Sequence, residues 1–296
     1  MNQSQLPLVS VVIPHRGPDG PLNLCIEALR QQTYPRPRIE ILIVLNEPMR
    51  RTQTFELEPN ERLLWQPDYY SYASRNMGIE ASKGSIIALT DSDTVPDPRW
   101  VELGVQTLEN DYDIVAGLIS LTFHQFPLTA PACYEKLFAF DQEKNVAFGR
   151  AATANLMLWR STFSSYGLFD GSSKSGEDFY WTSRAATLGA RLVFAHAVKV
   201  SHPARETFSE IFAKAKRVSD GYQSSKHPVS RVLMAAIDYV SINLAPPSRK
   251  KQQAVSGREK VLGYTIAIVI QAAKLIFLIK SLATRNKHQE FGLLEK

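Results

Sequence analysis

The sequence contains few of the features that mark several large classes of protein. It has only two cysteines in 296 residues, Cys25 and Cys133, and each stands among apolar neighbours. This pattern indicates buried, reduced thiols and argues against a disulfide framework or a zinc site. The N-terminus also lacks the basic segment and the long apolar segment of a secretory signal, so we expect a cytoplasmic protein.

Glycine-rich motifs that bind phosphate are missing as well. The chain has no G-x-x-x-x-G-K-[ST], and no G-x-G-x-x-G follows its first predicted strand. Helix-turn-helix, zinc-finger and RNA-binding aromatic signatures are not found either. These absences exclude a P-loop nucleotidase and a dinucleotide-binding enzyme, and we expect no nucleic acid partner.

The composition is that of a globular protein, with 44% hydrophobic residues and a net charge of +5. The positive charge is concentrated in the last fifth of the chain. This asymmetry favours a phosphate-bearing partner or an anionic membrane surface. The cations concerned are Arg249, Lys250, Lys251, Arg258, Lys260, Lys274, Lys280, Arg285 and Lys287.

Apolar runs alternate with amphipathic segments along the first part of the chain. Residues 9–13, 39–45 and 85–89 read as buried strands, and residues 22–32 and 72–82 as helices. This alternation predicts an α/β fold with a doubly wound, mostly parallel sheet. In such sheets ligands bind beyond the carboxyl ends of the strands, so the loops after Ile13, Leu45 and Leu89 are expected at the site.

Further strands are predicted at residues 113–121 and 191–195, and further helices at 132–142, 177–188 and 208–218. The character of the chain changes near residue 228. We therefore expect a domain over residues 1–227 and a helical C-terminal appendage over residues 228–296.

The strand at 85–89 is followed by Asp91-Ser92-Asp93. Side chains two residues apart in an extended chain point the same way, so both carboxylates can face one spot. Such like charges repel unless a cation lies between them, which points to a divalent metal. Asp-Ser-Asp before two prolines is equally typical of a turn.

Other charged and amide side chains follow the same strands or their neighbouring helices. Cations, hydrogen-bonding groups and metal-binding carboxylates together suit a nucleoside diphosphate. The residues expected at this edge, besides the two aspartates, are Arg16, Asn46, Glu47, Arg75 and Lys83.

A second acidic element opens the predicted helix at Glu177-Asp178. Carboxylates at a helix N-terminus are often simple caps, but one of the pair could act as a general base toward an acceptor hydroxyl. His202 follows a strand-like segment. A lone histidine is usually structural, although imidazole is also a suitable third metal ligand.

Three segments together resemble the family-2 glycosyltransferases, which have the GT-A fold. They are VSVVIP…EILIVLNE (9–47), SRNMGIEASKGSIIALTDSDTVPDPRW (74–100) and ATANLMLW…SGEDFYWTSRAATLGARLVFAHAVKVSHP (152–203). The second carries the aspartate-x-aspartate element of the family. In the third, Asp178, Arg184, Gly189 and His202 fall at the spacings of the family.

The resemblance implies a metal-dependent, inverting transfer of a sugar from a nucleotide-diphosphate sugar. Asp91 would face the ribose and the diphosphate, Asp93 would bind Mg²⁺ or Mn²⁺, His202 would be a further ligand and Asp178 the base. The implied nucleotide-binding residues are Pro14, Arg16, Asn46, Glu47, Arg75, Lys83 and Asp91. Residues 150–155 and 123–148 are expected on the acceptor side. The expected acceptor is a glycan or a lipid-linked molecule in polysaccharide, glycolipid or cell-envelope glycan synthesis.

The sequence departs from the family pattern in three places. Asn46 stands where an aspartate often reads the base, and Pro14-His15-Arg16-Gly17 replaces Pro-x-Tyr-Asn. The Q-x-x-R-W element of processive synthases is absent, which favours transfer of a single sugar. Two alternatives stay open: a polyprenyl-phosphate glycosyltransferase, and a non-catalytic membrane-associated scaffold of the same fold.

The segment 261–282 is long enough to cross a bilayer but contains Gln271, Lys274 and Lys280. Because charges are costly in the middle of a spanning helix, an in-plane helix is as well supported as a span, and a core helix is the plain alternative. Basic flanks favour the cytoplasmic leaflet, so we expect association with the inner face of the cell membrane.

Overall fold

A computed structural model describes residues 6–49, 55–224 and 246–294. The chain divides into two compact units. The first, called here the sheet unit, comprises Met1–Thr122, Phe140–Ser172 and Glu177–Pro203. The second, the helical unit, comprises the segments Phe123–Ala139, Ser173–Gly176 and Ala204–Lys296. The expected domain boundary between residues 227 and 228 lies outside the described residues and stays a prediction.

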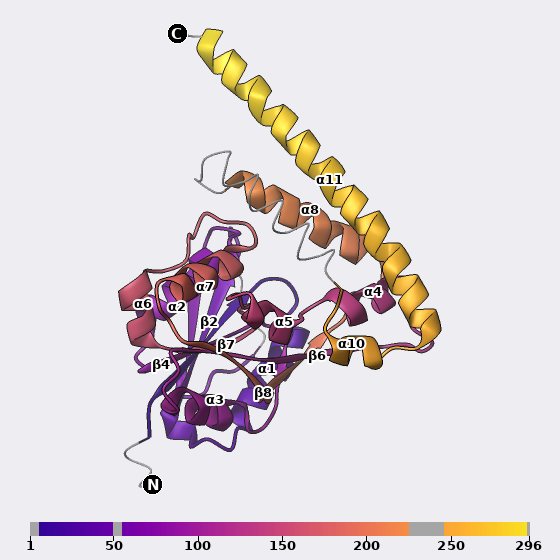
Figure 1. Ribbon diagram of the computed structural model, residues 1–296. Coiled ribbons are helices and arrows are strands. Elements are labelled where there is room, and N and C mark those ends of the chain that lie inside the picture. Colours follow the sequence, from indigo (N-terminus) through magenta and orange to yellow (C-terminus); the bar gives the residue numbers. More distant parts are fainter. Residues whose placement is uncertain (1–5, 50–54, 225–245, 295–296) are drawn as a thin grey trace. The chain divides into compact units, whose positions relative to one another are not determined.

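The first half of the sheet is parallel, as the alternating pattern predicts (Figure 1). Continuous apolar runs form its central strands because both faces of these strands are covered. Its elements are β1 (Val9–His15), α1 (Asp19–Arg30), η2 (Arg36–Arg38), β2 (Ile39–Asn46), β3 (Glu61–Gln66), α2 (Ser71–Ala81) and β4 (Ile86–Thr90). Val9 pairs with both Ile39 and Ile86, so β1, β2 and β4 end at one edge.

The second half contains both strand directions. Strand β7 pairs antiparallel with β4 and β6, and the two-residue β5 pairs antiparallel with β8. The order of the eight strands is β3-β2-β1-β4-β7-β6-β8-β5. The elements are β5 (Val95–Pro96), α3 (Trp100–Glu109), β6 (Ile114–Thr122), α5 (Gln142–Ala147), β7 (Asn155–Trp159), α6 (Arg160–Tyr166), α7 (Glu177–Thr187) and β8 (Leu192–Pro203). The sheet is therefore mixed but mostly parallel, as expected.

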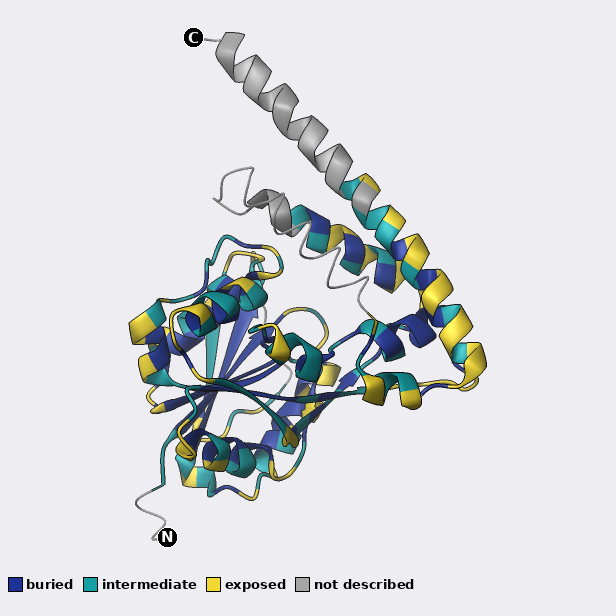
Figure 2. Cartoon of the chain, in the orientation of Figure 1, coloured by how far each residue is buried: buried dark blue, intermediate teal, exposed yellow. Residues whose placement is uncertain are grey.

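Two apolar layers cover the sheet, and its central strands β1, β2 and β4 are wholly buried (Figure 2). Alternate residues of β1 serve opposite layers: Val11 packs into one and Val12 into the other. Helix α2 packs so close to β1 that only glycine fits at position 78. A Cβ there would lie 2.4 Å from Val12 Cγ1. This close contact fixes the helix that carries Tyr72 and Arg75.

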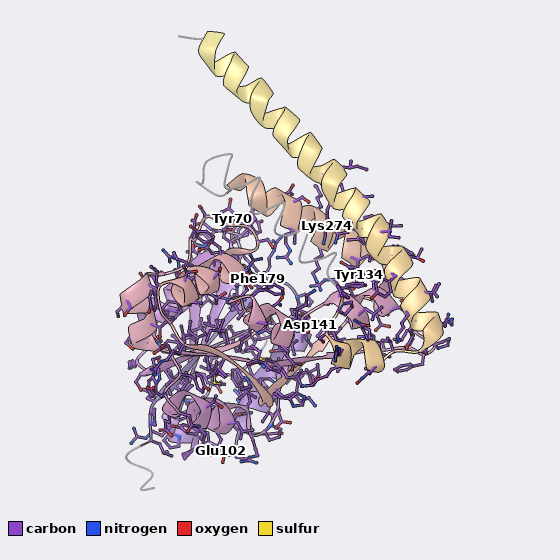
Figure 3. All side chains as sticks on the ribbon, viewed as in Figure 1. Tyr70, Glu102, Tyr134, Asp141, Phe179 and Lys274 are labelled. Carbon is purple, nitrogen blue, oxygen red and sulfur yellow. The ribbon has the colours of Figure 1, made fainter. Side chains whose placement is uncertain are left out.

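The helical unit is built from α4 (Ala130–Phe138), α8 (Phe208–Ser224), α10 (Arg249–Gln253) and α11 (Gly257–Leu294). Ile211, Ile266 and Ile270 form its small apolar core with Tyr134, which Figure 3 labels together with Lys274 of α11. Glu135, fully buried, is held by Arg205 at 3.1 Å and by Lys214 at 3.2 Å. Within the described residues, no helix has the length and apolar content needed to span a membrane.

Candidate active site

The Asp-Ser-Asp segment forms a tight turn directly after β4. The backbone N–H and the hydroxyl of Thr94 both donate to the carbonyl oxygen of Asp91, at 3.2 and 2.8 Å. Thr94 is fully buried, and its hydroxyl lies 2.7 Å from that of Thr90. The turn interpretation is thus confirmed, and the turn leaves the side chains of Asp91 and Asp93 31% and 40% exposed.

The pairing of β5 with β8 brings His202 to this turn. Val95 lies opposite Ser201 in an antiparallel register, so the residue before β5 and the end of β8 meet. His202 is 3% exposed, and its Nε2 lies 3.5 Å from Oδ1 of Asp93. Its Nδ1 donates to the carbonyl oxygen of Pro203 at 2.7 Å, so Nε2 is the ring nitrogen on the side of the carboxylate.

Asp91, Asp93 and His202 form a candidate metal centre. Each offers one ligand atom, and these three atoms lie within 4.8 Å of one another. Two carboxylate oxygens and an imidazole nitrogen are a donor set that suits Mn²⁺ or Mg²⁺. A histidine whose second nitrogen donates to a backbone carbonyl is also the usual arrangement of a metal ligand. The donor set therefore fits the expected divalent ion.

Arg75 holds the first aspartate from α2. Its Nη2 lies 2.5 Å from Oδ1 of Asp91, and the arginine itself is only 4% exposed. The guanidinium also stacks over the ring of Tyr72, 5.5 Å from its centroid. Arg75 was expected near the nucleotide, and the structure brings it directly onto Asp91.

Asp178 lies in the first turn of α7, next to Phe179, which Figure 3 labels. Its Oδ1 accepts from the hydroxyl of Tyr72 at 2.9 Å and from the N–H of Phe179 at 3.0 Å, and its Oδ2 accepts from the N–H of Thr153 at 3.3 Å. Burial raises the pKa of Asp178, and the Tyr72 hydrogen bond and the charge of Arg75 partly oppose this. A half-buried carboxylate in this setting is suited to accept a proton.

Glu177 has a different environment from its neighbour. Its Oε1 accepts from the backbone N–H of Asp170 at 2.9 Å, and the residue is 6% exposed. Burial raises the pKa of Glu177 to about 7. Its bond to Asp170 supports the loop before α7, so of the two carboxylates only Asp178 shares a network with Tyr72.

The residues expected at the nucleotide follow β1 and β2. Asn46 ends β2 and is 5% exposed, and its Oδ1 has no hydrogen-bond partner among the described residues. Glu47 accepts from the N–H of Gly17 at 3.2 Å, and Arg16 stacks 4.3 Å over the ring of Tyr69. Pro14 is buried within β1.

Lys83 does not join this group. It precedes β4, and its N–H donates to Glu40 at the start of β2. Asp91 follows the other end of β4, and five strand residues of about 3.3 Å each separate the two edges. The structure therefore does not bring Lys83 to the aspartates, because the whole of β4 separates them.

Sequence reasoning missed Tyr72, whose only signal is its position one helical turn before Arg75. It also placed Asn155 in an acceptor-side segment. Asn155 is fully buried: its Nδ2 donates to the carbonyls of Leu118 (2.9 Å) and Val198 (3.0 Å), and its Oδ1 accepts from Trp100 (2.8 Å). Asn155 therefore joins strands inside the sheet.

The fold is shared with known enzymes of one class. A solved structure of the mannosyltransferase PcManGT from Pyrobaculum calidifontis, in complex with GDP-Man and Mn²⁺, matches with a TM-score of 0.60 and 16% sequence identity. The match covers 95% of this chain and 88% of that one. The fold is thus the GT-A fold of glycosyltransferases.

Sequence comparisons assign the family. The model of glycosyl transferase family 2 matches residues 10–151. Glycosyltransferase AglE of Haloferax volcanii is 30% identical over 94% of this chain and 98% of its own length. The probable glycosyltransferase YdaM of Bacillus subtilis is 24% identical over 75% of this chain and 57% of its own length. The chain belongs to the family-2 glycosyltransferases and is an enzyme of that family.

Proposed function

We propose that this enzyme is a metal-dependent, inverting glycosyltransferase that moves a sugar from a nucleotide-diphosphate sugar to an acceptor hydroxyl. The observation that carries the proposal is the convergence of Asp91, Asp93 and His202 within 4.8 Å. Arg75 and Tyr72 connect this cluster to Asp178 through α2. The Mn²⁺ and GDP-Man bound by the fold relative support the same donor chemistry.

The donor side would use the edge of the sheet after β1, β2 and β4. Asp91 and Asp93 would hold the divalent ion with His202, and the ion would neutralise the charge that develops on the leaving diphosphate. Asn46 offers a buried carbonyl oxygen that is suited to accept an N–H of the base. Pro14, Arg16 and Glu47 would line the same subsite.

On the acceptor side, Asp178 would take the hydroxyl proton while the acceptor oxygen attacks the anomeric carbon. The diphosphate would leave from the opposite face of the sugar, so the configuration of that carbon inverts. Asp91, held by Arg75, would orient the donor for this in-line geometry.

The test is calorimetric titration of the full chain with GDP, UDP, ADP and dTDP, with and without Mn²⁺. We expect one nucleotide to bind, and to bind only when Mn²⁺ is present. Asp93→Ala should abolish that binding. Asp68→Ala is the matched control, because Asp68 is an exposed carboxylate outside the cluster. Metal-independent binding would contradict the metal site, and no binding at all would favour the scaffold alternative.

The acceptor class is tested separately. A hydroxyl acceptor needs a general base, whereas a phosphate acceptor, as in a polyprenyl-phosphate glycosyltransferase, does not. Loss of turnover in Asp178→Asn with nucleotide binding retained would support the hydroxyl acceptor. Retained turnover would favour the phosphate.

We also propose that the helical unit binds the inner face of the cell membrane, as expected for an enzyme of cell-envelope glycan synthesis. Helix α11 is apolar on its inward side, at Ile266 and Ile270, and also along an exposed outer stripe. The outer stripe consists of Val261, Tyr264, Ile268, Val269 and Ile276, and Arg258 and Lys260 stand exposed at its start. A helix with this combination suits an anionic lipid surface.

Sedimentation with vesicles tests this surface. Vesicles with about 30% anionic phosphatidylglycerol should carry the wild type down, whereas zwitterionic vesicles should not. The double variant Val261→Ser, Ile268→Ser should lose the binding, and Leu188→Ser, which removes an exposed leucine elsewhere, should keep it. Equal binding by all variants would contradict the proposed surface.

A further inference from the structure

The two oxygens of Asp178 are not equivalent. A carboxylate oxygen has two lone-pair sites. Those of Oδ1 are used by the hydroxyl of Tyr72 and the N–H of Phe179. Oδ2 accepts only the longer bond from the N–H of Thr153, at 3.3 Å, among the described residues. One lone pair of Oδ2 therefore remains for another donor.

We propose that Tyr72 is a positioning residue that holds Oδ1 of Asp178, so that Oδ2 is the atom that receives the acceptor proton. The proposal rests on the proposed function, because it assigns an atom within that reaction. Tyr72 touches no reacting atom in this account. It acts through the carboxylate that it binds.

Helix α2 carries both the residue that binds the proposed base and the residue that binds Asp91 on the donor side. Tyr72 and Arg75 lie one turn apart, and Arg75 stacks on Tyr72 while it binds Asp91. Gly78, on the same helix, has no side chain and so allows α2 to pack tightly against β1. One rigid helix thus orients both the base and the aspartate at the metal centre.

The proposed step balances without a further reactant. The O–H bond of the acceptor breaks, and its proton moves to Oδ2 of Asp178. The acceptor oxygen bonds to the anomeric carbon, whose bond to the diphosphate oxygen breaks, and the diphosphate leaves with the electron pair. Tyr72 keeps its proton throughout, because burial and the charge of Asp178 raise its pKa well above the usual 10.

The sign of the effect follows from the groups that face Asp178. Tyr72 and Arg75 approach from α2, Thr153 from the loop before β7, and Glu177 precedes it on α7. The hydroxyl of Tyr72 stabilises the ionised carboxylate and so lowers its pKa. Removing that hydroxyl raises the pKa of Asp178.

The experiment is ¹³C NMR titration of the full chain labelled at the aspartate carboxyl carbons. The Asp178 resonance is assigned by its loss in Asp178→Asn. Tyr72→Phe, which keeps the ring under Arg75, should raise the pKa of Asp178 by about one unit. Tyr34→Phe is the matched control, because it removes another buried tyrosine hydroxyl, bonded at 2.7 Å to Pro7, and should leave that pKa unchanged.

A second readout separates this inference from the proposed function. With Mn²⁺ and GDP-mannose, or the donor that calorimetry selects, Tyr72→Phe should lower kcat about 10-fold at unchanged KM and move the acidic limb of the pH profile upward. An active wild type with an unaltered Tyr72→Phe profile and Asp178 pKa would overturn the inference alone. A wild type inactive on every donor would overturn the proposed function and this inference with it.

Discussion

Two carboxylate clusters, one in the helical unit and one in the sheet unit, differ in burial and in the charges around them. In the helical unit, Glu135 is fully buried and both its oxygens meet cations, Arg205 and Lys214. In the sheet unit, Asp91 and Asp93 converge with His202 and stay about one third exposed. The first arrangement neutralises charge where it stands, whereas the second accumulates negative charge that a cation would offset. A buried carboxylate between two cations therefore indicates a structural role, whereas two part-exposed carboxylates that converge with a histidine indicate a site.

The largest expected effect is a loss of turnover when the proposed base of the sheet unit is replaced. Asp178→Asn should lower turnover by about 10²–10⁴-fold, because the amide cannot accept the hydroxyl proton. Its melting temperature should stay close to that of the wild type. Single-turnover kinetics with the selected donor and a thermal scan of the same sample check both statements. A loss below 10-fold would contradict the role of Asp178.

The next prediction concerns the buried pair of the helical unit. Glu135→Gln should lower the free energy of unfolding by about 3 kcal/mol, because Arg205 and Lys214 lose their shared counter-charge. Asp93→Asn should cost nothing in metal-free protein, since it relieves repulsion. Chemical denaturation of both variants measures the contrast. Equal destabilisation by the two variants would contradict the distinction between a structural carboxylate and a carboxylate of a metal site.

A smaller effect should follow from binding of the metal. Mn²⁺ at 100 times its dissociation constant should stabilise the wild type by about 2.7 kcal/mol, a rise of several degrees in melting temperature. Asp93→Asn should show no rise, whereas Asp68→Asn should respond like the wild type. A rise of the same size in all three would place the ion elsewhere.

The last prediction is a pH dependence of stability. Burial and the nearby Lys214 lower the pKa of Lys274 to about 7, against 10.5 in an unfolded chain. Between these values the unfolded state binds more protons, so this lysine makes stability rise with pH from about 7 to 10. Lys274→Met should flatten that rise, and Lys260→Met, which removes an exposed lysine of the same helix, should not. Denaturation at pH 7, 8.5 and 10 measures the slope.

Local patterns predicted much of this molecule. The runs at residues 9–13 and 39–45 are recognisable because parallel central strands are apolar on both faces. Strand β3 (Glu61–Gln66) escaped notice, because its half-buried residues alternate too weakly. The predicted helix over 132–142 is two helices, since Phe140 adopts a φ of 51° between α4 and α5.

The site shows the same division. Asp91, Asp93, Asp178 and His202 were found from local spacing and from the family resemblance. Tyr72 could not be found, because its contact with Asp178 joins residues 106 positions apart. Lys83 shows the opposite case. It is close to Asp91 in sequence, but the two lie at opposite ends of β4.

The most direct test of the central claim is anomalous diffraction from crystals of the full chain soaked in Mn²⁺. The account predicts a manganese peak within coordination distance of Asp91, Asp93 and His202, about 2.0–2.3 Å from each ligand atom, and its loss in Asp93→Ala. A crystal with manganese bound at other residues, or with none at this cluster, would contradict the metal centre.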